Sequence, residues 1–184
     1  MTAPLKIAVL VHIHASSQAS RADLSELQET VLVPLLDAFE PVRGLQLGLH
    51  LSGPLLEFID AEARPLVARL KSGVREGRFE MLGGGFYDPV MPVIPQRDQV
   101  GQAKLLSNTL EQLVGRRPEG CWLPLSAWDP CIIESLREAG LRWTLVDGEA
   151  FEALGRRPAE VHGLFRTERL GTSLRLFPID NGLS

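Results

Sequence analysis

Residues 5–14 read LKIAVLVHIH, and this short β-branched stretch decides the fold class. Alternate side chains of a strand point to opposite faces, so one face here is aliphatic and the other ends in His12 and His14. Residues 45–52, LQLGLHLS, repeat this division, with leucines on one face and His50 on the other. An open wound sheet needs two apolar faces, because helices cover both. A polar face on successive strands therefore favours part of a barrel whose interior holds a site.

Strands and amphipathic helices alternate along the rest of the chain, which predicts an α/β protein of parallel β/α repeats. Ser20 and Asp23 predict a capping box, Pro34 predicts a kink or an early break, and Arg64-Pro65 predicts a division between two helices. We expect strands at residues 5–14, 45–52, 79–84, 121–126, 143–146 and 174–179, and helices at residues 23–39, 54–76, 98–114, 130–139 and 149–154.

Composition excludes several classes of function. The 184 residues suit one domain, and 45% hydrophobic with 23% charged residues is ordinary for a globular protein. A net charge of −4 with scattered Lys and Arg argues against a nucleic-acid partner. No segment reaches the length of a membrane span, and the apolar N-terminal run has the pattern of a strand and not of a signal peptide. Two cysteines, Cys121 and Cys131, fit a reducing cytoplasmic location.

Polar and aromatic groups collect where the predicted strands end, which is where parallel sheets and barrels place their sites. His12 and His14 lie on one face about 7 Å apart by strand rise, a spacing that suits two ligands of one metal ion or two contacts to one polyol. Histidines near a strand end also serve simply to satisfy backbone groups. A metal ion would need a third ligand, for which the sequence offers His50, Glu80 or Asp147.

Two later segments carry further candidates. Residues 80–88, EMLGGGFYD, place three glycines before two aromatic residues, which permits close backbone approaches beside a flat surface. A tight loop with an aromatic plug would have the same sequence. Trp122 and Trp128 could stack on sugar rings or pack against a helix. Asp147 could act as a general acid or as the cap of the helix that follows it.

In this order the segments resemble the N-terminal part of the catalytic barrel of glycoside hydrolase family 57, the α-amylase and 4-α-glucanotransferase family. The likeness runs from residue 5 to residue 180. VHIHASS resembles the opening His-x-His-Gln-Pro segment of the family, HLSGPLLEFI its second strand, and GRFEMLGGGFYDPVMPVIPQRDQVGQ its central signature. GCWLPLSAWDP resembles its Trp-Leu-x-Glu-Arg-x-Trp-Glu-Pro block, and LVDGEAF and LRLFPID resemble later segments. The resemblance implies an incomplete seven-stranded (β/α) barrel and an α-glucan substrate.

The same resemblance implies a chain without its catalytic groups. Retaining glycosidases need two carboxyl groups about 5 to 5.5 Å apart. The nucleophilic Glu of the family corresponds to Leu125 and the neighbouring Arg to Ser126, while the acid/base Asp belongs to a segment beyond residue 184. The Gln-Pro of the opening segment is Ala15-Ser16, which puts that substrate contact in doubt. We therefore expect no catalytic residue, no metal and no cofactor. The expected substrate-binding residues are His12, His14, Glu80, Tyr87, Trp122, Trp128 and Asp147.

Three interpretations follow. The first is a catalytically degenerate relative, or pseudoenzyme, that binds an α-glucan or another oligosaccharide, or has a structural role. The second is a metal-dependent hydrolase or deacetylase that uses His12 and His14, which requires more ligands than the four histidines supply if His162 lies in a loop. The third is a truncated fragment of an active hydrolase or transferase. We expect residues 1–184 to form one domain, incomplete at its C-terminal end, whose open barrel edge is covered by a second copy or a partner chain. The alternative architecture is an open parallel sheet flanked by helices on both sides.

Overall fold

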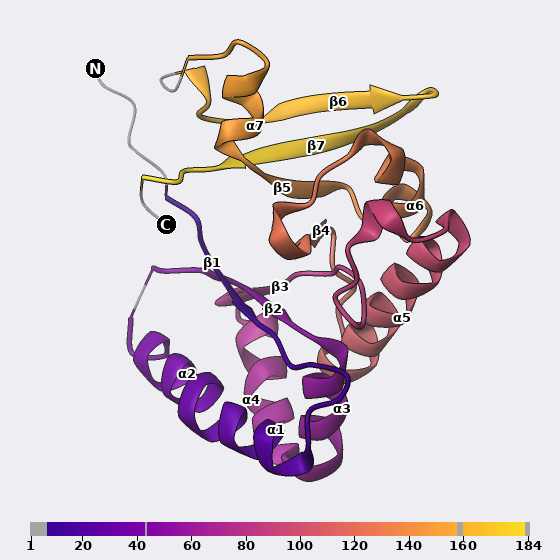
Figure 1. The fold of residues 1–184 in the computed structure, drawn as a ribbon. Helices are drawn as coiled ribbons and strands as arrows, with labels where there is room; N and C mark the ends of the chain where they lie inside the picture. The colour runs from indigo at the N-terminus through magenta and orange to yellow at the C-terminus, as the bar shows by residue number, and fades with distance from the viewer. Residues whose placement is uncertain (1–6, 43, 158–159, 183–184) are drawn as a thin grey trace.

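A computed structural model of the chain describes residues 7–42, 44–157 and 160–182 (Figure 1). Its strands lie in the order β1-β2-β3 and β4-β5-β7-β6, all parallel except β6. A parallel bridge between Gly83 and Cys121 joins the two groups into one series. The strands are β1 Val9–Ile13, β2 Leu47–Leu51, β3 Phe79–Met81, β4 Gly120–Cys121, β5 Trp143–Asp147, β6 Phe165–Arg169 and β7 Thr172–Ile179.

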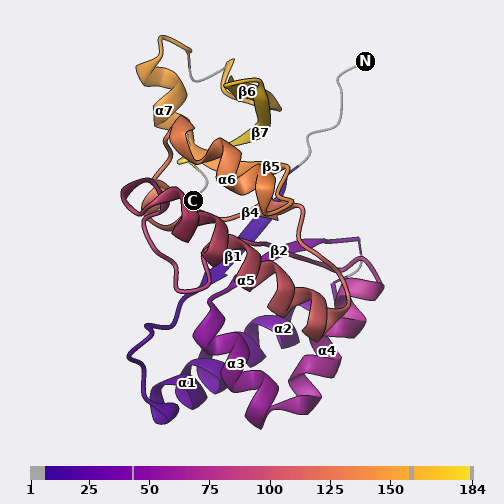
Figure 2. The same cartoon turned by 90° about the vertical axis from the view of Figure 1, so that its right-hand side faces the viewer.

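Helices follow most of these strands and cover them on the outside (Figures 1 and 2). They are α1 Arg21–Leu27, α2 Val33–Phe39, α3 Gly53–Glu62, α4 Arg64–Arg75, α5 Gln96–Val114, α6 Ile133–Glu138 and α7 Gly148–Ala153, with one π-helical turn at Gln28–Leu32 and 3-10 turns at Met91–Val93, Pro124–Ser126 and Pro130–Ile132. None of the helices in the described ranges has the length and apolarity needed to cross a bilayer.

Two apolar cores hold the strands and helices together. The first lies between β1–β3 and the helices α1 to α5, and the second lies between β4–β7 and the helices α5 to α7. Helix α5 contributes to both, with Leu106 and Leu110 in the first core and Ala103 in the second. Figure 2 shows α5 lying across both halves of the chain. This helix therefore fixes the loops after β3 and β4 relative to each other.

The predicted fold class is confirmed, since parallel strands alternate with helices from β1 to β5. The capping box of α1 is present, with the Ser20 hydroxyl accepting from the Asp23 N–H and the Asp23 carboxylate accepting from the Ser20 N–H. The division between α3 and α4 falls at Ala63, one residue before the predicted position. The expected start of the first strand, residues 5–6, lies outside the described residues.

Pro34 does not end its helix early, which corrects one of the two alternatives stated for it; the other alternative, a kink, stays a prediction. The Val33 N–H bonds to the Gln28 carbonyl five residues back, so the chain passes through a π-helical turn immediately before the proline. A proline clashes with the carbonyl four residues before it, and a wider turn relieves that clash. The helical path therefore continues through α2 to Phe39.

Two strand predictions are also corrected. The strand expected over residues 121–126 ends at Cys121, because Pro124 starts a 3-10 turn in which Leu125 and Ser126 adopt φ values of 56° and 50°. Strand β6 was not predicted, since its alternating charged residues lie mostly exposed. It pairs with β7 through a tight turn at Leu170-Gly171, where both residues have positive φ as a two-residue hairpin requires.

Candidate functional site

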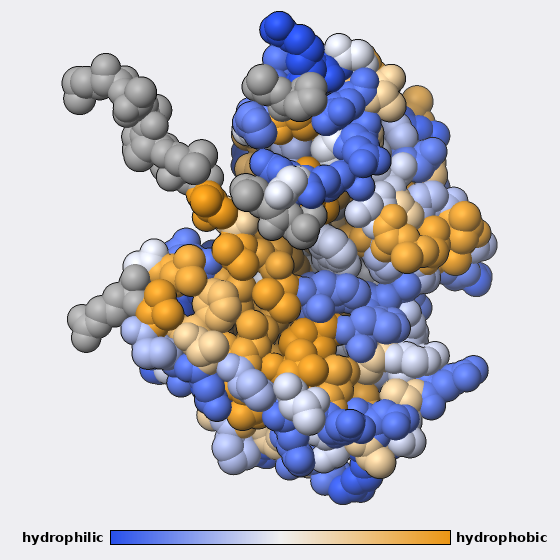
Figure 3. Space-filling view, turned by 60° about the vertical axis from the view of Figure 1, so that its left-hand side comes forward, coloured by the Kyte–Doolittle hydropathy of each residue, from blue (hydrophilic) through white to orange (hydrophobic). Residues whose placement is uncertain are grey.

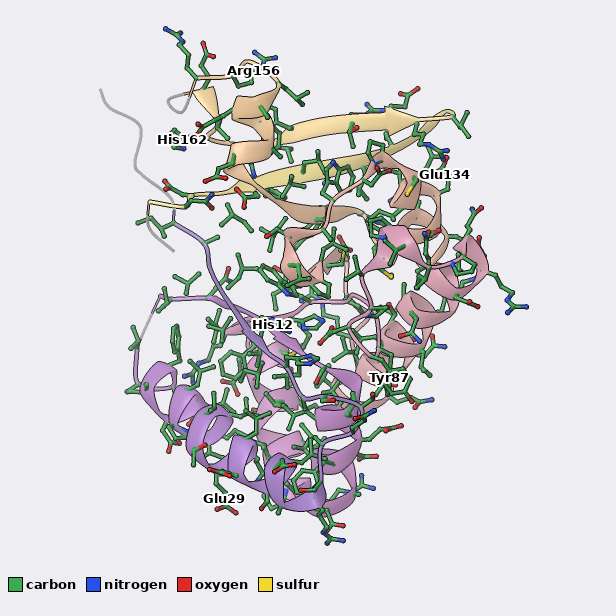
Figure 4. The ribbon with its side chains drawn as sticks, viewed as in Figure 1. His12, Glu29, Tyr87, Glu134, Arg156 and His162 are labelled. Atoms are coloured by element: carbon green, nitrogen blue, oxygen red, sulfur yellow. The ribbon has the colours of Figure 1, made fainter. Side chains whose placement is uncertain are left out.

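Three imidazoles and one carboxylate meet where β1, β2 and β3 end. His12 of β1 pairs in register with His50 of β2, and their ring centroids lie 5.0 Å apart. His14 follows β1, and Asp88 lies in the loop after β3. Figure 4 places the His12 side chain between the two halves of the fold, with Tyr87 on the same loop as Asp88. The carboxyl ends of parallel strands share one edge, which explains why residues 76 positions apart are neighbours here.

The Asp88 carboxylate is the centre of this group. Its Oδ2 lies 2.7 Å from His14 Nδ1 and 3.5 Å from His12 Nε2, both within hydrogen-bond distance. Its Oδ1 lies 3.6 Å from Nε2 of His50, just beyond that distance. The Asp88 side chain is only 2% exposed, whereas those of His12 and His14 are 26% and 48% exposed. The carboxylate is therefore buried, and the two imidazoles that contact it form the solvent-accessible part of the cluster.

The glycine loop before Asp88 explains how the carboxylate reaches the histidines. A Cβ on Gly84 would lie 2.8 Å from the Trp122 carbonyl oxygen and 3.0 Å from His50 Nε2, so only glycine lets the loop pass between them. The Gly53 N–H donates to the Phe86 carbonyl at 2.7 Å, which ties the loop to the start of α3. Asp88 itself has a φ of 50°, an uncommon conformation for a non-glycine residue and a frequent one at functional sites.

Burial and charge set the protonation of the two inner groups. Burial lowers the pKa of His50 to about 4, and the nearby Asp88 charge offsets only part of this effect. His50 is consequently a neutral imidazole near pH 7. Burial raises the pKa of the Asp88 carboxyl, but hydrogen bonds from His12 and His14 and, in the acidic range where His50 is protonated, the charge of His50 outweigh it, so the pKa lies below its ordinary value. Asp88 is therefore an ionised carboxylate at neutral pH.

Several buried polar atoms at this edge have no hydrogen-bond partner among the described residues. They are Nδ1 and Nε2 of His50, Oδ1 of Asp88 and Nε1 of Trp122. His50 is fully buried, and the Trp122 ring lies 5.4 Å from the His12 ring between centroids. Buried polar groups are nearly always paired, so four such atoms in one place distinguish this cluster from an ordinary core.

The predicted binding residues divide into two groups. His12, His14, Tyr87 and Trp122 all lie at the carboxyl ends of β1, β3 and β4, and Tyr87 is 47% exposed. Glu80 is exposed and lies level with Gly48, two residues before the level of His50, so it does not join the cluster.

Trp128 and Asp147 have structural contacts. Trp128 packs against the second core. The Asp147 carboxylate accepts from the Glu149 N–H at 2.9 Å and from Asn181 Nδ2 at 2.6 Å, which caps α7. His162 is exposed in the segment before β6, as predicted, and Figure 4 draws it far from His12.

Asp88 is the residue that sequence reasoning missed. The proposed third ligands for a metal ion were His50, Glu80 and Asp147, and the group nearest to both exposed histidines is instead the aspartate that ends GGGFYDP. A signal was present in the sequence, because an Asp-Pro pair that follows a run of glycines indicates a tight turn of the backbone, and such a turn can direct the Asp side chain back toward the strand ends.

Leu125 lies on the loop after β4, at the same carboxyl-terminal edge of the strands. Its side chain is 86% exposed and its backbone has a φ of 56°. A left-handed conformation costs an ordinary residue about 1 to 2 kcal/mol, and an exposed leucine regains little of it by packing. The loop therefore holds a strained backbone that the leucine side chain does not explain.

Comparison with known proteins agrees with this architecture. The sequence profile of "Glycosyl hydrolase family 57" matches residues 8–184. This chain belongs to glycosyl hydrolase family 57. It is 28% identical over 179 residues to Alpha-amylase 1 of Dictyoglomus thermophilum, covering 97% of this chain and 26% of that protein. It is 33% identical over 150 residues to the 4-alpha-glucanotransferase of Thermococcus litoralis, covering 82% of this chain and 23% of that one.

A solved structure gives the same result for the fold. The crystal structure of the Thermococcus litoralis 4-alpha-glucanotransferase matches with a TM-score of 0.91 and 30% identity, over 96% of this chain and 28% of that chain. The family 57 chain described here thus spans about a quarter of the length of these relatives. The resemblance inferred from the sequence is confirmed.

Proposed function

We propose that this family 57 chain binds an α-glucan at the carboxyl ends of its strands without cleaving it. The observation that carries the proposal is Leu125, which occupies the position expected for the nucleophilic carboxylate. A hydrocarbon side chain can neither attack an anomeric carbon nor accept a proton, and retaining glycosidases require a pair of carboxyl groups. The strained backbone at Leu125 supports descent from a loop that once positioned a reactive group.

Two aromatic side chains favour a sugar ligand. Tyr87 is half-exposed, and Trp122 lies against His12 at the same edge. Flat rings stack on the C–H faces of pyranose rings, while imidazole and carboxylate groups bond to the hydroxyls around them. His12 supplies such a polar group beside Trp122, and His14 lies next to His12 at the same edge. The names of the relatives, an alpha-amylase and a 4-alpha-glucanotransferase, make a maltooligosaccharide the first ligand to test.

The test has a binding arm and a turnover arm. Calorimetric titration of the purified chain with maltooligosaccharides in EDTA should give saturable binding, and Tyr87→Ala should weaken it at least tenfold. Phe177→Ala is a matched control, because Phe177 is also a partly exposed aromatic residue but lies on β7 beside Trp143. Release of reducing ends from the same sugars should stay at the level of a blank.

Each arm can fail separately. If the titration shows no binding at millimolar sugar, the proposal of a sugar site is overturned and a structural role remains. Measurable turnover that disappears in Glu80→Ala or Asp147→Ala would overturn the loss of catalysis, since it would show that another carboxylate replaces the missing nucleophile.

A further inference from the structure

We propose that His12, His14 and Asp88 bind one divalent transition-metal ion, with Zn²⁺ as the ion that best fits their chemistry. His12 and His14 also belong to the proposed sugar site, but the inference does not require sugar binding, because it depends on the contacts of these two histidines with Asp88 and of Asp88 with His50. Each of the three residues offers one donor atom, and the three atoms all lie within 4.8 Å of one another. Two imidazole nitrogens and one carboxylate oxygen form a ligand set that suits zinc and its neighbours better than magnesium or calcium.

Two of the three donor–donor distances are close to those around a bound metal ion. Ligand atoms of a tetrahedral zinc ion, at bonds of about 2.0 Å, lie about 3.3 Å apart. The distances from Asp88 Oδ2 to His14 Nδ1 and His12 Nε2 are 2.7 Å and 3.5 Å, which bracket that value. Small side-chain movements would therefore open the cluster around an ion, and no strand or helix would need to shift.

His50 is the second, independent observation. It is fully buried, its Nε2 is directed toward Asp88 Oδ1 at 3.6 Å, and neither atom has a partner among the described residues. Carboxylates that bind a metal through one oxygen commonly accept a hydrogen bond on the other, which fixes their orientation. When Oδ2 binds the ion, the neutral His50 ring can donate from Nε2 to Oδ1. His50 is thus a positioning residue and not a ligand.

The remaining coordination positions lie on the exposed side of the cluster. Trp122 lies against His12, whereas His14 is 48% exposed and borders an open hollow. The hollow is also lined by Ala15, Ser16, Gln18, Ala19, Asp23 and Leu27. Three protein ligands with an open position are typical of zinc sites that bind water or an oxygen of a substrate. The bound metal ion would therefore have an open position for an oxygen ligand, such as water or a hydroxyl group.

Metal titration of the chelator-stripped full chain tests the proposal. Calorimetry with ZnCl₂ should give one equivalent, and CoCl₂ should give the visible absorption bands of a low-symmetry Co²⁺ site. His14→Ala and Asp88→Asn should weaken binding at least a hundredfold, and His50→Gln should weaken it about 10- to 100-fold, as loss of an outer-shell partner does. His162→Ala is the matched control and should bind as the wild type does, because His162 lies far from the cluster.

Two results would overturn the proposal. One is no uptake by a wild-type chain that melts cooperatively, and the other is equal affinity in His14→Ala and the wild type. If the variants fail to fold, NMR of the wild-type imidazole nitrogens still decides. Zinc should shift the ring signals of His12 and His14 and leave that of His162 in place, and unchanged signals of His12 and His14 would reject the site. Because sugar binding is measured in EDTA, failure of either proposal is distinguishable from failure of the other.

Discussion

At the scale of single residues, the site depends on one aspartate that the strand pattern does not reveal. Asp88 adopts a positive φ and so turns its carboxylate back toward the strand ends, where His12 and His14 are already aligned by the two-residue period of β1. The histidines could be predicted from that period. The direction of Asp88 could not, because a loop side chain points where its backbone angles send it.

Cys121 allows a prediction on pH at the same scale. Burial raises the pKa of its thiol from 9.0 to about 12. The thiol ionises near pH 9 in the unfolded chain but keeps its proton when folded, so the free energy of unfolding should fall as the pH rises above 9. The loss between pH 8 and pH 10 should be about 1.4 kcal/mol greater in the wild type than in Cys121→Ala.

Urea unfolding of both chains at each pH measures this difference. Other groups that ionise in the same range, Cys131 among them, are common to the two chains and cancel in the comparison. Parallel pH profiles for the wild type and Cys121→Ala would contradict the prediction.

At the scale of elements, two of the three corrected segments share a physical cause. Pro34 and Pro124 both alter the hydrogen bonding that the apolar pattern predicts, the first by forcing a π-helical turn and the second by starting a 3-10 turn after β4. In both segments the apolar pattern fails at one residue, since Val31 and Leu125 are 42% and 86% exposed. Sequence patterns do not specify whether the chain adapts to a proline by breaking, widening or turning.

Glycine substitutions test the role of the loop after β3. Gly84→Ala should destabilise the fold by about 2 kcal/mol or more, because its Cβ would lie 2.8 Å from a backbone oxygen, and strain of this kind belongs to the larger mutational effects. Gly101→Ala is the matched control within α5, where a Cβ would meet nothing within 4 Å. It should stabilise the fold by about 0.5 to 1 kcal/mol, since alanine is the better helix former.

Chemical denaturation gives both values, and zinc titration of Gly84→Ala adds a second readout. Displacement of the loop should weaken metal binding in Gly84→Ala and leave it unchanged in Gly101→Ala. Equal stability of the two variants would show that the loop yields easily and is not held by close packing.

At the scale of the whole molecule, β1 lies at one edge of the strand series in the described part of the chain. Figure 3 shows apolar side chains gathered on the face beside this edge, next to the point where the described chain begins. Ile7 and Val9 are 63% and 36% exposed. Exposed apolar edge strands pair readily with other chains. We therefore predict that a second copy of the chain covers this edge.

Self-association is the expected outcome in solution. Sedimentation analysis over a concentration series should show reversible dimers, and Val9→Lys should shift the chain toward the monomer, since an edge lysine opposes strand pairing. Leu154→Lys is the control, because Leu154 is 85% exposed but ends α7 in the other half of the fold. A monomer at every concentration, or an equal shift in both variants, would contradict the prediction.

The sequence alone determined the alternation of strands and helices, the helix caps and the two histidines at the end of β1, because each depends on a local period or on residues within a few positions. The resemblance to family 57 also predicted that Leu125 stands at the position of the nucleophile, and this stays a prediction. Only the tertiary structure decided that Asp88 meets His12, His14 and His50, since that contact joins segments 76, 74 and 38 residues apart and depends on how helix α5 holds the loops after β3 and β4. Local rules give the faces of each element, whereas the packing of the two cores decides which faces meet.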